Sequence, residues 1–215
     1  MKSKSNHLLL SIVIFPTLVL IGGCAGTPKH SGFLNSYADM ANKFNLDQVR
    51  IAPGASLASY DTLIIAPVDT SCLGIDDIQV DEDRQNVLNK LEEHFRVEMA
   101  PYFKTITSNA SEPGLGAHAV RLEWAITELR PTDVVKNLVW GFGVGNATGS
   151  IEGRFVDVKT GQELAAFTDR KKGSPFTKKE YDSQMKFPNW SKLRYLYIFT
   201  EIWAENAGHL VKSMR

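Results

Sequence analysis

Three stretches of the chain carry the hydrophobic pattern of β-strands. Residues 119–129 and 151–158 alternate between apolar and polar side chains, as a strand with one buried face does. After a turn in which Gly161 can take positive φ, residues 163–169 return as a partner strand. The pattern therefore predicts one long strand and one β-hairpin. The apolar positions of the long strand are Val120, Leu122, Trp124, Ile126 and Leu129.

A β–α–β unit is predicted earlier in the chain. Residues 60–68 contain a short apolar run ended by a proline, which is typical of a buried strand. An acidic loop follows, and Asp81 or Asp83 is expected to cap a helix that runs to about Phe103. A second short strand is predicted at residues 104–107. The apolar residues that recur at helical spacing are Val87, Leu88, Leu91, Phe95 and Met99.

The last predicted helix begins near Ser191 and runs towards Lys212, with one apolar face. Together these elements predict a single small α+β (or α/β) domain over residues 55–215. Its mixed sheet is expected to have about four to five strands, packed by two main helices. Residues 24–54 are expected to form a tether and an N-terminal extension, of which residues 31–40 pack onto the domain.

The N-terminus has the features of a bacterial lipoprotein signal peptide. Lys2 and Lys4 precede an apolar run over residues 8–21, which is short for a membrane span and of the right length for a signal peptide. Gly22 and Gly23 then precede Cys24, an arrangement that resembles a lipobox. The resemblance implies cleavage before Cys24, so that residues 1–23 are removed and the Cys24 thiol carries a diacylglyceryl group. The alternative is an ordinary signal peptide or a single membrane anchor that happens to contain this cysteine.

Acylation of Cys24 would fix the protein to a membrane, because two or three acyl chains anchor far more firmly than one. Ala25 follows the cysteine at a position where inner-membrane retention signals often carry aspartate. By similarity to sorted lipoproteins, this favours the periplasmic side of the outer membrane of a Gram-negative cell. The small and polar residues 25–28 suit a tether between lipid and domain.

Composition narrows the classes of function. The chain has 215 residues with 24 basic and 24 acidic side chains, so it lacks the basic excess of a nucleic-acid-binding protein. Removal of the signal peptide takes away two lysines and no acidic residue, which makes the mature chain slightly acidic. Two cysteines exclude a disulfide-rich scaffold and a four-cysteine zinc site. Acylation of Cys24 would leave Cys72 as a single thiol. Three interpretations of this thiol are open: a structural cysteine, a nucleophile, or a site of intermolecular disulfide pairing.

Several of these motifs together resemble one protein family. The lipobox at Cys24 is followed by Ser-Gly-Phe-Leu at residues 31–34 with Tyr37, and later by Ile-Ala-Pro-Val at residues 65–68. Residues 151–161 form a strand and turn of the same type. This combination resembles a family of uncharacterised bacterial lipoproteins, domain of unknown function thirty-three thirteen. The family has no established catalytic residues, so the resemblance assigns none to this chain.

The glycine-rich stretch at residues 140–149 is the most unusual in composition. Its glycines alternate and a strand pattern follows, whereas a dinucleotide-binding loop needs Gly-x-Gly-x-x-Gly before a helix. We expect either the start of a strand with close backbone packing, or an apolar contact with a membrane or partner through Trp140 and Phe142. A pocket near this stretch would favour a small-ligand-binding or lipid-binding module.

The titratable residues do not fall into a recognised catalytic or metal-binding pattern. The acidic residues at positions 76–83 lack the spacing of a calcium-binding loop and are expected to be solvated or to cap the helix. The histidines of the mature chain show no paired metal-ligand spacing, and no nucleophile-elbow motif is present. We therefore expect no cofactor, no metal and no enzymatic activity, with an envelope hydrolase as the weakest alternative.

A basic run lies beyond the predicted hairpin and comprises Arg170, Lys171, Lys172, Lys178 and Lys179, of which Lys171 and Lys172 are the candidate contact residues. Such runs are usually solvated surface, but this one could contact peptidoglycan carboxylates, lipid phosphates or an acidic partner. The sequence thus predicts a lipid-anchored periplasmic protein of the outer membrane that binds or scaffolds an envelope protein or peptidoglycan. Nucleic acid is not an expected partner.

Overall fold

A computed structural model describes residues 30–75, 77–109, 118–133, 146–173 and 193–215 of the chain. These residues form one mixed sheet with the strand order β1-β2-β7-β6-β5-β3-β4. β3 runs parallel to β4 and to β5, and the other neighbouring strands are antiparallel. The elements are β1 (Ala41–Lys43), β2 (Leu46–Ile51), β3 (Thr62–Ile65), α1 (Asp81–Met99), β4 (Thr105–Thr107), β5 (Ala119–Arg130), β6 (Ala147–Asp157), β7 (Glu163–Gly173) and α3 (Arg194–Ser213).

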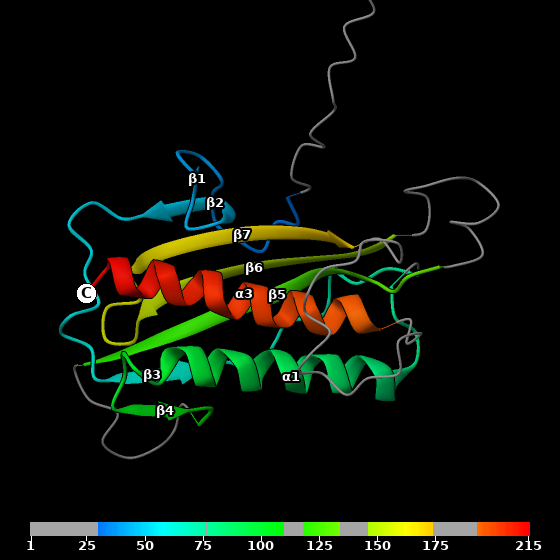
Figure 1. The fold of residues 1–215 in the computed structure, drawn as a ribbon. Coiled ribbons are helices and arrows are strands. Elements are labelled where there is room, and N and C mark those ends of the chain that lie inside the picture. Colours follow the sequence, from blue (N-terminus) through cyan, green and yellow to red (C-terminus); the bar gives the residue numbers. More distant parts are fainter. Residues whose placement is uncertain (1–29, 76, 110–117, 134–145, 174–192) are drawn as a thin grey trace, which may run out of the picture.

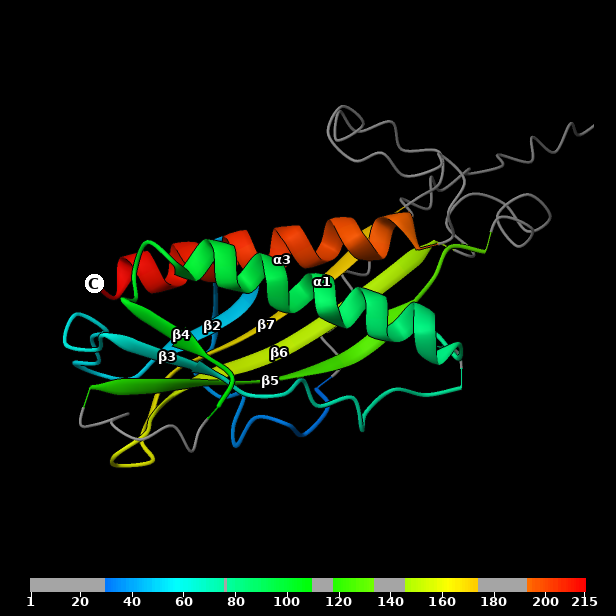
Figure 2. The same ribbon diagram turned by 90° about the horizontal axis from the view of Figure 1, so that it is seen from below.

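The fold has two layers. α1 and α3 lie side by side and cover one face of the sheet (Figure 1). Seen from below, residues 30–40 and the chain between β3 and α1 lie on the other side of the sheet (Figure 2). We call this second face of the sheet, opposite the helices, the open face.

The alternation in β5 explains why the helices pack on one face only. Successive side chains of a strand point to opposite faces, so the apolar residues of β5 gather under α1 and α3. Leu129 joins them although it breaks the alternation by one position, because the pairing of β5 with β6 shifts register between Ile126 and Glu128. Such a bulge turns the following residues to the other face. The five apolar positions predicted for this strand are all buried in the core: Val120, Leu122, Trp124, Ile126 and Leu129.

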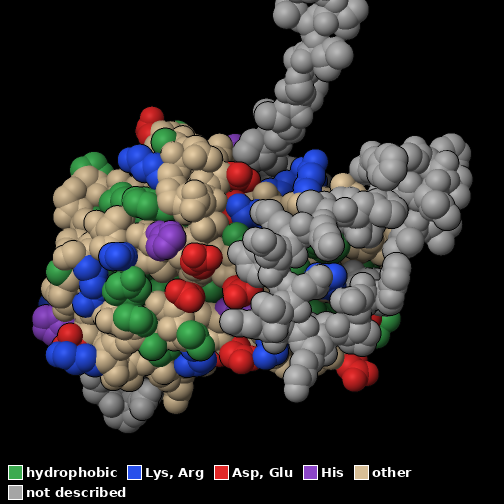
Figure 3. Space-filling view, viewed as in Figure 1, with side chains coloured by type: hydrophobic (Ala, Val, Ile, Leu, Met, Phe, Trp, Pro, Cys, Tyr) green, Lys and Arg blue, Asp and Glu red, His purple; other side chains and the backbone are tan. Residues whose placement is uncertain are grey.

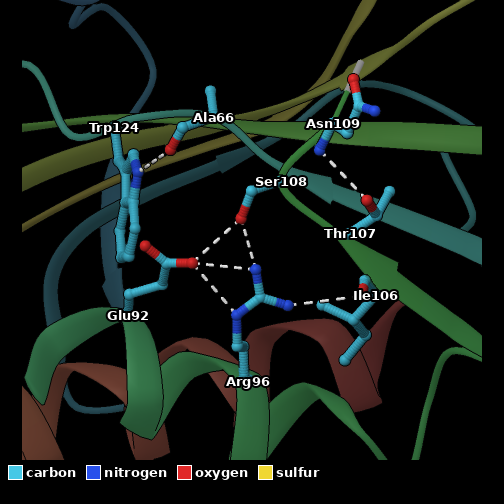
Figure 4. A network of polar contacts seen from close by, with 8 residues as sticks. All are labelled: Ala66, Glu92, Arg96, Ile106, Thr107, Ser108, Asn109 and Trp124. Atoms are coloured by element: carbon cyan, nitrogen blue, oxygen red, sulfur yellow. Dashed lines mark hydrogen bonds and ion pairs between the residues drawn. The ribbon is translucent and has the colours of Figure 1, made fainter. Parts of the chain in front are cut away.

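The predicted β–α–β unit is confirmed, since β3 and β4 are parallel neighbours connected through α1. A polar network ties α1 to the residues after β4 (Figure 4). Arg96 donates to Glu92 Oε1 over 2.8 and 3.0 Å and to the carbonyl oxygen of Ile106 over 3.3 Å, and it also bonds Ser108. These contacts fix the short edge strand against the helix.

Four details differ from the sequence prediction. The described sheet has seven strands, because β1 and β2 pair with β7 and extend it beyond the expected four to five. These two strands precede residue 55, so the sheet includes part of the predicted extension. α1 ends at Met99, four residues before the expected Phe103. Its N-cap is Val80, without a side-chain cap, so the predicted capping by Asp81 or Asp83 is wrong.

Glycines of β6 lie where large side chains meet the strand. A Cβ atom on Gly149 would lie 2.8 Å from Trp203 of α3, and one on Gly153 would lie 2.4 Å from Cζ of Phe167. Both distances are far below a normal carbon–carbon contact, so a side chain at either position would have to displace an aromatic ring. One of the two predictions for the glycine-rich stretch is the start of a strand with close backbone packing. Gly149, at the end of that stretch, agrees with this prediction.

Candidate functional site: a polar pocket on the open face

Two arginine–glutamate–arginine groups stand on the open face of the sheet, one towards each end of β5. In the first, the carboxylate of Glu123 forms ion pairs with Arg121 at 2.5 Å and with Arg154 at 2.7 Å. In the second, Glu128 accepts Nε of Arg170 over 2.7 Å and its Nη2 over 3.1 Å. Arg130 reaches the same carboxylate at 3.4 Å. We call the second set, Arg130, Glu128 and Arg170, the Glu128 group.

The Glu128 group lines a pocket of about 420 Å³. The register of the sheet builds this pocket, because Glu128 lies opposite Ser150 of β6, which in turn lies opposite Arg170 of β7. Directly opposed residues of antiparallel strands share a face, so these three side chains stand in one row. The lining residues are His30, Ser31, Cys72, Gly74, Asp77, Thr127, Glu128, Arg130, Ser150 and Arg170.

The ion pairs of the Glu128 group stay charged around neutral pH. Burial alone would raise the pKa of Glu128, but hydrogen bonds from Arg170 and Thr148 and the charges of Arg170 and Arg130 outweigh it and lower the pKa. The hydrogen bond to Glu128 in turn raises the pKa of Arg170. Glu128 is therefore ionised and already holds its donors, which makes it a poor general acid or base at neutral pH.

Asp77 fixes the loop that forms another wall of the pocket. Its carboxylate accepts the amide of Gly74 and the amide of Leu129, each over 2.6 Å, and the residue is 7 % exposed. The prediction that this acidic residue is solvated or caps the helix is therefore wrong. Cys72 lies in the same loop as an exposed free thiol that lines the pocket.

The N-terminal segment, residues 30–38, is held on the open face beside the pocket. Glu152 of β6, 1 % exposed, accepts the amide of Ser31 over 3.0 Å and the hydroxyl of Tyr37 over 2.5 Å. The ring of His30 stacks on Tyr37 with 3.8 Å between centroids. Arg50 of β2 donates to the carbonyl oxygens of Ser36 and Ala38. The expectation that residues 31–40 pack onto the domain is confirmed, and sequence reasoning missed Glu152 as their partner.

The structure does not bring together the residues that the sequence singled out as possible site residues. Cys24, Trp140 and Phe142 lie outside the described residues. Lys171 points to the helix side, where its Nζ lies 2.8 Å from Asp169. Lys172 is exposed and opposes Thr148, in the row that also holds Arg130 on the open face. The alternation of a strand thus splits the basic run between two faces. Arg170, the first residue of the run, lines the pocket together with Arg130, which sequence reasoning missed.

The residues that the structure describes contain no cluster of three metal-ligating side chains. No helix in this part of the chain has the length and apolar character needed to cross a membrane. Where described residues form the visible surface of the helix-covered face, acidic and basic side chains are interspersed (Figure 3).

Comparison with known families decides the classification. A family model described as "Protein of unknown function (DUF3313)" matches residues 29–194. The chain belongs to this family. The match spans the N-terminal segment, the whole sheet and α1, and it confirms the resemblance seen in the sequence.

The DUF3313 chain is also weakly similar to several solved structures. The PelC dodecamer from Paraburkholderia phytofirmans is 12% identical with a TM-score of 0.44, over 74% of this chain and 95% of that chain. Protein XCC0632 from Xanthomonas campestris is 10% identical with a TM-score of 0.42, over 77% and 95%. A protein from Caulobacter crescentus that is predicted to be a lipoprotein is 16% identical with a TM-score of 0.33, over 73% and 87%. No curated protein matches the chain.

Proposed function

We propose that this DUF3313 protein is a lipoprotein, anchored through Cys24 to the periplasmic side of the outer membrane, whose domain is a non-enzymatic binding module for an envelope component. The attachment of the N-terminal segment to Glu152 carries the proposal. That segment begins only six residues after the lipobox cysteine. A buried carboxylate holds it on the sheet, so the anchor and the domain are mechanically connected.

The tether is short. His30 follows Cys24 by six residues, and six extended residues span at most about 20 Å. The open face near His30 therefore stays close to the lipid that Cys24 would carry. A domain held in this way has restricted orientations, which suits a module that meets a partner at the membrane surface.

A binding role is favoured over a catalytic one by the chemistry of the pocket. Its arginines and Glu128 are engaged in ion pairs, and the pKa values of Glu128 and Arg170 are displaced away from neutrality. Such groups orient a ligand and stay charged, whereas general acid–base catalysis needs a group that titrates near the working pH. A small ligand bound in the pocket is the second candidate function, favoured by the 420 Å³ cavity.

The substitution Cys24→Ser tests the anchor. We expect the variant to lose acylation and to leave the outer-membrane fraction as an uncleaved or released chain. Cys72→Ser is the matched control, because it removes the other cysteine of the chain and should fractionate as the wild type does. Acylated Cys24→Ser protein in the outer membrane would overturn the proposal.

Crosslinking in intact cells tests the binding role. Purification of the acylated chain after crosslinking should recover one envelope protein or peptidoglycan fragments in stoichiometric amount. Recovery of the chain without any crosslinked component would contradict a binding module. Turnover of an envelope polymer, lost in Cys72→Ser, would instead support the hydrolase alternative.

A further inference from the structure

The N-terminal segment lies on the open face (Figure 2) and contains no helix or strand. Side chains of the sheet hold it. Glu152 accepts the amide of Ser31 and the hydroxyl of Tyr37, and Arg50 donates to two carbonyl oxygens of the segment. Within the segment only Leu34 is buried, at 3% exposure. The attachment therefore depends on polar contacts and one buried apolar side chain.

The arginines under the segment have partners within the sheet. Arg50 of β2 pairs with Glu163 of β7 at 2.6 Å. Arg154 of β6 pairs with Glu123 of β5 at 2.7 Å, and its guanidinium carbon lies 5.6 Å from the ring centroid of Phe33. Both ion pairs connect neighbouring strands, so they persist when the segment leaves. Its departure would expose a polar strip and leave the sheet itself intact.

Glu152 is the sheet residue that a departure of the segment changes most. Its carboxylate is buried, and burial of a carboxylate costs hydration free energy that hydrogen bonds must offset. Without the segment, water reaches the carboxylate and replaces the donors from Ser31 and Tyr37. The lost hydrogen bonds and the regained hydration oppose each other. Such a balance favours a local opening that costs less free energy than global unfolding.

Asp39 marks a hinge between the segment and the sheet. Its φ is +59°, a conformation that residues other than glycine adopt rarely. β1 begins two residues later and pairs with β2. A few residues at the end of an element can absorb a large change of backbone angles. Rotation at Asp39 would therefore move the segment and leave the pairing of β1 undisturbed.

We propose that the N-terminal segment is a releasable strap, which opens as a unit at Asp39 while the sheet and both helices stay folded. Release lengthens the tether. Six positions separate Cys24 from His30 and span at most about 20 Å, whereas fifteen positions separate Cys24 from Asp39 and span at most about 50 Å. His30 and Ser31 also line the pocket, so the same motion removes part of its wall.

The change in reach rests on the proposed function, because it requires the lipid on Cys24. With the strap closed, the open face stays near the membrane. With the strap released, the domain reaches components that lie farther from the lipid. The strap thus regulates how far from the membrane the binding module works. Opening of the strap itself depends on the domain and not on the anchor.

The first experiment is hydrogen exchange resolved to single amides, on the full chain as isolated in an uncharged detergent. The amides of Ser31, Gly32 and Leu34 donate to Glu152 or to Tyr37. We expect their protection factors to be at least about tenfold smaller than those of β6 and nearly independent of low urea, as in a local opening. The same urea dependence for these amides and for β6 would mean that the segment leaves only on global unfolding. That result would overturn the strap.

Tyr37→Phe tests whether the strap opens as a unit. The amide of Ser31 donates to Glu152 and not to Tyr37, so a purely local loss would leave its protection unchanged. Opening as a unit predicts that protection of this amide falls by about tenfold, as for the loss of one buried hydrogen bond. Tyr102→Phe is the matched control and should leave it unchanged. Unchanged protection of Ser31 in Tyr37→Phe would contradict the strap.

The second experiment measures reach. Cys72 is the remaining thiol of the acylated chain and takes a donor fluorophore. Vesicles of phosphatidylethanolamine and phosphatidylglycerol carry acceptors on a fraction of their headgroups. Leu34→Ser combined with Tyr37→Phe removes the buried apolar side chain and the phenol, and this variant should lose energy transfer relative to the wild type. Tyr102→Phe should retain it. Equal transfer in all three would overturn the change in reach.

The outcomes separate the strap from the proposed function. Acylated Cys24→Ser protein in the outer membrane would overturn the proposed function, and the change in reach with it. The exchange of the segment amides would still decide whether the strap opens. The wild-type exchange pattern needs no substitution, so it decides this even where the double variant does not fold.

Discussion

The hydroxyl of Tyr37 lies 2.5 Å from Oε2 of Glu152, and 115 positions separate the two residues in the chain. This hydrogen bond closes the N-terminal segment onto β6. The same hydroxyl accepts the amides of Gly32 and Leu34, so one phenol organises the turn of the segment and its attachment. Burial and the hydrogen bond to Glu152 both raise the pKa of Tyr37, which keeps the donor protonated.

Removal of the Tyr37 hydroxyl should destabilise the domain. Tyr37→Phe leaves one oxygen of the buried Glu152 without its donor, which costs about 1 to 3 kcal/mol in the free energy of unfolding. Urea unfolding followed by circular dichroism measures the change. Tyr102→Phe on the other side of the fold is the control and should change stability by less than about 0.5 kcal/mol. Equal effects of the two substitutions would mean that the hydrogen bond to Glu152 contributes nothing.

A side chain at position 153 should not fit. Gly153→Ala places a methyl group 2.4 Å from the ring of Phe167, so the ring or the strand must move. We expect a loss of about 1 to 3 kcal/mol in the free energy of unfolding, as for other overpacked cores. Gly74→Ala is the control, since the nearest atom to its added methyl group lies at 3.7 Å. A Gly153→Ala variant as stable as the wild type would show that Phe167 has room to move.

Stability should rise as the pH falls from 7 to 5, because of Asp169. Burial raises the pKa of this carboxyl to about 6, against the opposing effect of Lys171. A carboxyl with a raised pKa stabilises the fold fully below its unfolded value, and this contribution is lost as the pH rises through about 6. Carboxylates with lowered pKa values, such as Glu123 and Glu128, destabilise the fold when they become protonated. This loss of stability occurs only at lower pH.

The test is the substitution Asp169→Asn, compared with the wild type by denaturant unfolding across this range. The wild type should gain about 1 to 1.5 kcal/mol from pH 7 to pH 5, whereas the variant should stay nearly flat. A steep dependence that persists in Asp169→Asn would assign the effect to other groups.

The two helices should be coupled through one hydroxyl. Thr200 of α3 donates to the carbonyl oxygen of Tyr197, so His94 of α1, 3.0 Å away, must donate its Nδ1 proton to the same hydroxyl. Thr200→Val should therefore cost about 1 kcal/mol, visible as a lower thermal midpoint. Thr105→Val, at an exposed position of β4, should leave the midpoint nearly unchanged. A similar midpoint for both variants would contradict the coupling.

Local patterns were enough to predict the β–α–β unit and the buried face of β5, because both depend on the period of neighbouring residues. β1 and β2 could not be predicted in the same way. β2 mixes charged residues such as Asp47 and Arg50 with apolar ones, and it becomes a strand by pairing with β7, more than a hundred positions later. Long-range pairing of this kind leaves no local period.

The pocket was hidden from the sequence for a related reason. Arg170 and Arg130 are forty positions apart and meet only through the register of three strands. The basic run drew attention to Lys171 and Lys172, but a strand alternates its faces, so these two neighbours point to opposite sides. The separation of Tyr37 from Glu152 likewise exceeds any motif length.

The central claim is that Cys24 carries the lipid to which the open face is tethered. Intact-mass spectrometry of the protein isolated from its envelope tests it most directly. We expect a chain that begins at Cys24 and carries a diacylglyceryl group and an amide-linked acyl chain, with Cys72 free. A mature chain with an unmodified Cys24 thiol, or one cleaved elsewhere, would contradict it.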